Sequence, residues 1–117
     1  MASGKRHVAL LGLLAGLGAG QAALADEPAG ERRDALIHMV RQDCGSCHGL
    51  TLCGGLGPAL LPETLAGKPV DGLVATILAG RPGTAMPPWR AFLDEGEARW
   101  IVERLQRGFP PVANRSR

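Results

Sequence analysis

The stretch Cys44-Gly45-Ser46-Cys47-His48 decides the fold of this 117-residue chain. Its spacing is C-x-x-C-H, with two thiols on adjacent helical positions and an imidazole directly after the second thiol. This is the attachment pattern of c-type haem, in which both cysteines form thioethers with the haem vinyl groups and the histidine becomes the proximal iron ligand. The motif predicts one covalent haem c, bound through Cys44 and Cys47, with His48 on the iron.

Two other uses of these residues fit the sequence less well. A thioredoxin-like redox pair needs a strand-helix-strand frame around its C-x-x-C, and no strand pattern is present. A structural zinc site needs four ligands in separated pairs, whereas the three cysteines and His48 all lie between positions 44 and 53. Haem is therefore the interpretation that the motif favours.

The first 25 residues read as a secretory signal peptide. Lys5 and Arg6 precede an apolar run over residues 8–19, and Ala25 fits a signal peptidase site. The alternative is an uncleaved anchor, but the run is shorter than the roughly 20 residues that cross a bilayer. We expect export to the periplasm, where c-type haem is attached, and no stable membrane insertion after cleavage.

Composition predicts a single small domain. Residues 26–117 carry 11 basic and 11 acidic side chains, so no broad basic field exists for nucleic acid, and that partner is excluded. The 17 glycines and 9 prolines, against four aromatic residues, indicate short helices joined by tight turns. We expect one small helical domain over residues 26–117, with a loose tail over residues 109–117.

Met86 is the candidate sixth ligand of the iron. It follows His48 by 38 residues, in a loop that Pro87 and Pro88 hold extended. Met39 lies on the flank of the helix before the motif and is expected to pack, and His38 is expected to be solvated. A methionine that only fills a core gap is the alternative for Met86.

Three further residues are predicted around the haem. The carbonyl of Pro58 is the candidate acceptor for the Nδ1–H of His48, or else belongs to a plain turn. Trp89 is a candidate donor to a haem propionate, and Arg81 a candidate ion-pair partner for one. A packed tryptophan and a surface arginine are the ordinary alternatives.

Two helices follow from their end signals. Pro69 opens one helix, which Gly80 ends. Asp94 and Glu97 form a capping box for a helix over residues 95–107, which Gly108 ends. The predicted buried stripe of that last helix consists of Ala98, Trp100, Ile101 and Leu105.

This order of motifs resembles a class I cytochrome c over about residues 30–108. The resemblance implies a cytochrome c domain over residues 26–117 with its core at about residues 30–108. The resemblance to the NirC family, small periplasmic cytochromes c encoded beside the haem c and haem d nitrite reductase of denitrifying bacteria, rests on four segments: residues 49–52 (GLTL), 54–60 (GGLGPAL), 65–68 (LAGK) and 80–89 (GRPGTAMPPW). The resemblance implies an all-α fold of short helices and loops wrapped around the haem. It also implies electron donation to that nitrite reductase or to haem d assembly, with an upstream electron donor as second partner.

Cys53 departs from the family pattern, where a basic or polar residue is expected. Three interpretations stay open for this odd thiol: a tolerated side chain, a redox-sensitive group, and a disulfide that links two chains.

The function predicted from the sequence is outer-sphere transfer of single electrons, without catalytic residues. One alternative is a haem enzyme or sensor in which a labile Met86 lets a small ligand reach the iron. The other is a scaffold in haem d assembly. The sequence leaves the reduction potential, the physiological partner and the oligomeric state undetermined.

Overall fold

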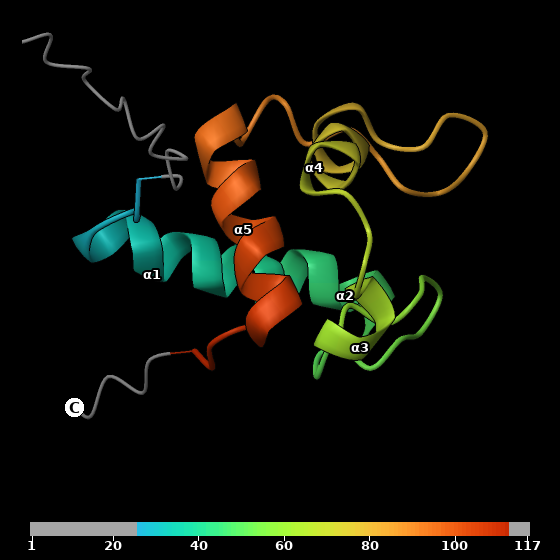
Figure 1. Cartoon of the computed structure of the whole chain (residues 1–117), viewed down its shortest axis with the longest axis horizontal. Coiled ribbons are helices and arrows are strands. Elements are labelled where there is room, and N and C mark those ends of the chain that lie inside the picture. Colours follow the sequence, from blue (N-terminus) through green and yellow to red (C-terminus); the bar gives the residue numbers. More distant parts are fainter. Residues whose placement is uncertain (1–25, 113–117) are drawn as a thin grey trace, which may run out of the picture.

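The computed structural model describes residues 26–112, which form helices and connecting loops without a strand (Figure 1). The predicted signal peptide at residues 1–25 lies outside this range. The elements, in chain order, are α1 (Gly30–Met39), the π-helical turn η1 (Val40–Cys44), α2 (Gly45–His48), α3 (Pro62–Leu65), α4 (Val70–Ala79) and α5 (Glu95–Arg107). No helix within residues 26–112 is both long enough and apolar enough to cross a membrane.

The helix that leads to the C-x-x-C-H motif is one rod made of α1, η1 and α2 (Figure 1). The spacing of apolar residues predicts a uniform helix here, but the structure widens it to a π turn between Val40 and Cys44. Leu36 and Val40 are fully buried, while Cys44 is half-buried and Cys47 exposed. Met39 packs against the core and His38 is exposed, as expected.

The core lies where α5 crosses the α1 rod and packs against α3 and α4 (Figure 1). Trp100 is 2% exposed, and the predicted stripe of α5 is buried throughout. Val102 adds a further buried side chain to that stripe. The buried hydrophobic residues are Leu36, Ile37, Val40, Leu52, Leu65, Val74, Leu78, Leu93, Ala98, Trp100, Ile101, Val102 and Leu105.

The capping box of α5 is present and is tied to α1. Glu97 N donates to Asp94 Oδ1 at 2.8 Å, and Asp94 N donates to Glu97 Oε2 at 3.1 Å. The same Glu97 carboxylate accepts from Arg32 Nη2 at 2.7 Å, and Arg32 also donates to the carbonyl of Phe92. The pKa of Glu97 is lowered, chiefly by the hydrogen bond from Arg32. One carboxylate thus caps a helix and joins two helices.

Glu27 holds the start of the described chain against α5. Its carboxylate pairs with Arg104 and, at 3.3 Å, with Arg33. The pKa of Glu27 is lowered, first by Arg104, with smaller effects of Arg33 and the nearby indole of Trp100. The Trp100 N–H is itself buried and makes no hydrogen bond within the described residues.

The first residues after α5 are held in place, although composition predicts a loose segment from residue 109 onward. Arg41 Nη2 donates to the carbonyl of Phe109 at 2.7 Å, and Arg41 Nε donates to that of Pro110 at 3.1 Å. The Phe109 ring lies under the Arg41 guanidinium and meets Trp100 edge-on. Carbonyl acceptors and an aromatic face for Arg41 therefore order this part of the tail, while residues 113–117 lie outside the described range.

Candidate haem-binding site

The two motif cysteines are free thiols at the end of the α1 rod. Burial, and secondarily the negative charge of Asp43, raise the pKa of Cys44 to about 11. Within residues 26–112, no group of three His, Cys, Asp or Glu side chains could hold a metal ion.

The loop after α2 folds back onto the end of that helix. Gly57 N donates to the Cys47 carbonyl at 2.8 Å, and Gly54 N donates to the His48 carbonyl at 2.8 Å. These bonds satisfy carbonyls that a helix end leaves without partners. They also bring Pro58 beside the His48 ring.

His48 Nδ1 lies 2.7 Å from the carbonyl oxygen of Pro58, the acceptor that the sequence suggested. Because a carbonyl oxygen only accepts hydrogen bonds, the proton of the neutral imidazole is on Nδ1. Nε2 is then the bare nitrogen, with its lone pair available to a metal. The backbone of one turn thus selects the tautomer that an iron ligand requires.

Gly57 forms a cradle for the His48 imidazole that sequence reasoning did not single out. A Cβ added at Gly57 would lie 2.7 Å from His48 Cε1 and 2.8 Å from Nδ1, closer than side chains tolerate. Gly55 is similarly confined, since its Cβ would lie 2.9 Å from the Cys47 carbonyl. The signal in the sequence for the contact between Gly57 and the His48 ring is the high glycine content of residues 54–57.

The loop that carries Met86 is closed by its own hydrogen bonds. Arg81 N donates to the Met86 carbonyl at 3.1 Å. Thr84 Oγ1 donates to the Arg81 carbonyl at 2.7 Å and accepts from Met86 N at 3.3 Å. The loop also rests on Gly80, whose added Cβ would lie 2.7 Å from Met86 O. Met86 is half-buried.

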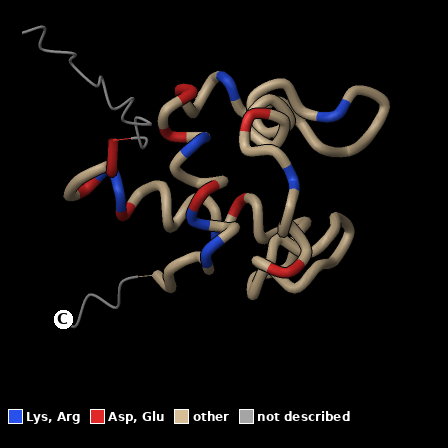
Figure 2. Tube along the Cα trace, viewed as in Figure 1, with Lys and Arg blue, Asp and Glu red and all other residues tan. Residues whose placement is uncertain are grey.

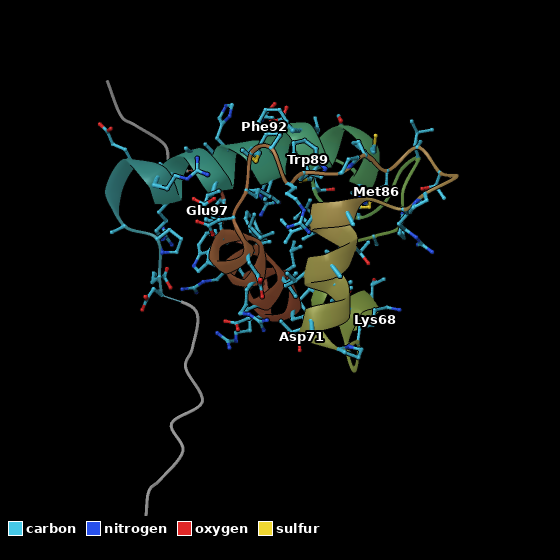
Figure 3. The ribbon with its side chains drawn as sticks, turned by 90° about the horizontal axis from the view of Figure 1, so that it is seen from above. Lys68, Asp71, Met86, Trp89, Phe92 and Glu97 are labelled. Atoms are coloured by element: carbon cyan, nitrogen blue, oxygen red, sulfur yellow. The ribbon has the colours of Figure 1, made fainter. Side chains whose placement is uncertain are left out.

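The Met86 loop and the loop after α2 project from the same end of the molecule (Figures 1 and 3). Trp89 is half-buried, with its ring 5.9 Å from that of Phe92 and tilted against it. Arg81 is exposed, and its side chain makes no hydrogen bond or ion pair within residues 26–112. Cys53 is exposed and free in the loop after α2, with Sγ 3.6 Å from the Thr51 carbonyl.

These residues fit a covalent haem. Two free thiols stand at the C-x-x-C-H spacing, and the imidazole that follows has a bare Nε2 and a cradle of glycine around it. A thioether lies on a second loop at the same end of the molecule (Figure 3). This donor set is that of a cytochrome c.

Comparison with known proteins agrees with the site. Residues 32–103 match the family described as cytochrome c oxidase, cbb3-type, subunit III. Cytochrome c55X of Stutzerimonas stutzeri is 60% identical over 88 residues, which cover 75% of this chain and 78% of that protein. The solved structure of a c-type cytochrome NirC is 58% identical, with a TM-score of 0.67, and the match covers 69% of this chain and 95% of that one.

A longer relative shares the same segment. Dihydro-heme d1 dehydrogenase of Pseudomonas aeruginosa is 39% identical over 101 residues, which cover 86% of this chain and 19% of that protein.

Fold and site together define a class I c-type cytochrome, with one haem c attached through Cys44 and Cys47. The chain belongs to the family of cytochrome c55X and NirC.

Proposed function

We propose that this cytochrome is a periplasmic carrier of single electrons for the nitrite reductase system, in which His48 and Met86 would ligate the haem iron. The observation that carries the proposal is the 2.7 Å contact between His48 Nδ1 and the Pro58 carbonyl, which leaves Nε2 free for the metal. A bound haem supplies the ferric/ferrous couple, and His/Met ligation raises its reduction potential.

The chain's own residues serve such a carrier by holding both donors in place. His48 is held by Pro58 and by the cradle of Gly57. Met86 is held by the hydrogen bonds of its loop and by the contact with Gly80. Ligands that stay in place through a redox change keep the reorganisation small, which favours outer-sphere transfer.

Trp89 and Arg81 complete the proposed site as neighbours of the haem propionates. Arg81 has an exposed guanidinium without an acidic partner in the described chain, and Trp89 presents an indole N–H donor.

Two electron acceptors are candidates. The likeness to NirC supports donation to the haem c and haem d nitrite reductase. The likeness to a segment of dihydro-heme d1 dehydrogenase supports a second role, in which the cytochrome exchanges electrons with the haem d assembly steps. We propose periplasmic location from the signal peptide pattern at residues 1–25.

The test begins with protein expressed in a periplasm that attaches haem c. Its reduced form is mixed anaerobically with oxidised nitrite reductase while haem absorption is followed. We expect one electron to leave each cytochrome, with no turnover of peroxide by the ferric form. Peroxide turnover would favour the enzyme alternative. Tight binding to assembly proteins without reoxidation by the reductase would favour the scaffold.

Thr84 is predicted to stabilise the Met86 ligand, because its hydroxyl bonds both ends of the loop. Thr84→Val keeps the shape and removes both hydrogen bonds, each worth about 1 kcal/mol. We expect the pH at which the ferric protein loses its methionine-dependent near-infrared band to fall by about one unit, since one pKa unit is about 1.4 kcal/mol.

Thr84→Ser is the matched control, because it retains the hydroxyl. A pH titration of the near-infrared band compares the three proteins. An unchanged midpoint in Thr84→Val would show that the hydroxyl does not hold the ligand.

A further inference from the structure

The wide turn η1 overlaps the haem motif. A hydrogen bond typical of a π turn runs from Gly45 N to the Val40 carbonyl, five residues back, where a regular helix would use the carbonyl of Arg41. Gly45 stands between the two motif cysteines, so the wide turn ends inside the attachment segment. Single π turns are rare within helices and are frequent at functional sites.

The wide turn changes which residue faces the core. In a regular helix Cys44 would continue the buried stripe of Leu36 and Val40, because residues four apart share a face. A π turn takes one more residue, and Gly45 is accordingly the next buried position after Val40, while Cys44 lies half-buried on the flank. A Cβ added to Gly45 would lie 3.3 Å from the Leu50 backbone, so this position suits a residue without a side chain. The turn therefore shifts the first haem-binding thiol off the core face.

Arg41, the second residue of the wide turn, donates to the tail that follows α5. Its Nη2 lies 2.7 Å from the Phe109 carbonyl oxygen and 3.1 Å from that of Pro110, and its Nε lies 3.1 Å from the latter. The guanidinium is also 5.6 Å from the centroid of the Phe109 ring. Residues 108–112 carry no charged side chain, so the acceptors that they offer a cation are backbone carbonyls and this ring (Figure 2).

These acceptors are themselves fixed to the core. Phe109 packs against it, and its ring meets the ring of Trp100 edge-on, with 6.1 Å between the centroids. Trp100 is almost completely buried. The planar fork of an arginine binds two carbonyls in one orientation, which a flexible ammonium group does not do. Arg41 therefore joins the wide turn to the core, and not only the tail to the rod.

We propose that Arg41 is a positioning residue for the haem motif. By donating to the Phe109 and Pro110 carbonyls it stabilises the wide turn, and the turn keeps Cys44 off the core face, with His48 following in the same rod. Replacing Arg41 should let the rod return toward a regular helix, in which Cys44 moves toward the core. The inference rests on covalent haem attachment and not on the proposed carrier function, so the two can fail separately.

Amide hydrogen exchange of the haem-loaded protein, followed by NMR in the ferrous state, tests this role. The variants are Arg41→Gln, which removes the charge and the fork, and Arg41→Lys, which keeps the charge alone. Arg33→Gln is the matched control, because Arg33 is also a half-buried arginine of the rod and ties the start of the described chain through Glu27. The haem methyl signals of the ferric proteins, which depend on the orientation of the axial ligands, give a second reading.

In Arg41→Gln we expect the Gly45 amide to exchange about tenfold faster, because the turn loses hydrogen bonds from a charged group, while the amide of Leu78 in α4 keeps its wild-type rate. The haem methyl pattern should change, since His48 ends the same rod. Arg41→Lys should lie between the wild type and Arg41→Gln, and Arg33→Gln should match the wild type in both readings.

The proposal requires both changes. Equal acceleration at Gly45 and Leu78 in Arg41→Gln would show that Arg41 only supports overall stability, and an unchanged methyl pattern would show that the motif does not follow the turn. Either result overturns the proposal, and so does an Arg33→Gln variant with the same effects. If Arg41→Gln gives no haem protein, Arg41→Lys decides by the same two readings. A wild-type protein whose Arg41 Nε proton shows no ring-current shift from Phe109 would also overturn it.

Discussion

Replacing Met86 by alanine is expected to abolish the near-infrared absorption band of the ferric protein, while the haem stays attached through Cys44 and Cys47. The reason is that Met86 supplies the only thioether on the loop beside the haem motif, and alanine has no donor atom. The reduction potential should fall by on the order of 0.2 V, a fraction of the roughly 0.8 V range that axial ligands cover.

The measurement combines absorption spectra of both oxidation states with a potentiometric titration. Met39→Ala is the matched control, since Met39 is a half-buried methionine that packs against the core from α1. It should lower stability and leave the band unchanged. A band that survives in Met86→Ala, or is lost in Met39→Ala, would refute the ligand assignment and revive the sensor alternative.

Gly80→Ala is expected to lower the stability of the protein more than any other glycine-to-alanine change in the loop that carries Met86. Gly80 ends α4 with φ of 69° and ψ of −171°, a backbone region that is essentially restricted to glycine and costs other residues about 1–3 kcal/mol. Its added Cβ would also lie 2.7 Å from three backbone atoms, Met86 O, Pro87 C and Pro88 N, and these cannot swing aside as a side chain can. We expect the free energy of unfolding to fall by about 3 kcal/mol.

Gly83→Ala separates the two causes, because Gly83 has φ of 77° but nothing within 4 Å of its added Cβ. It should lose only the conformational part, about 1–2 kcal/mol. Denaturant unfolding of both variants gives the comparison, and the near-infrared band reports whether Met86 has moved. Equal losses in the two variants would show that the contact between Gly80 and the loop is unimportant.

The residues at the ends of α4 and α5 are enough to predict where these two helices begin and end. Asp94 and Glu97 are three residues apart and predict the start of α5, and Gly108 predicts its end. Pro69 and Gly80 bracket α4 in the same way. The four-residue helix α3 has no side-chain cap, and its sequence carries too weak a signal to predict it.

The spacing of apolar residues does not predict the π turn before the haem motif. Apolar positions such as Leu36, Val40 and Cys44 fit a regular helix, and the pattern has no mark for the wider turn. The glycines posed a related problem. Gly57 and Gly80 read as turn residues, and their contacts with the His48 ring and the Met86 backbone appear only when the loops are folded.

The sequence by itself determined the chemistry of this protein: the covalent haem through Cys44 and Cys47, the helical class, and the candidate donors His48 and Met86. These follow from short-range spacing, which the chain carries whatever its fold. Only the tertiary structure decided how the elements are joined. Arg32 meets Glu97 across 65 residues, and Arg41 reaches the Phe109 carbonyl across 68. Such contacts depend on how α5 crosses α1, and a helix crossing is set by the packing of the whole core, which no local pattern encodes.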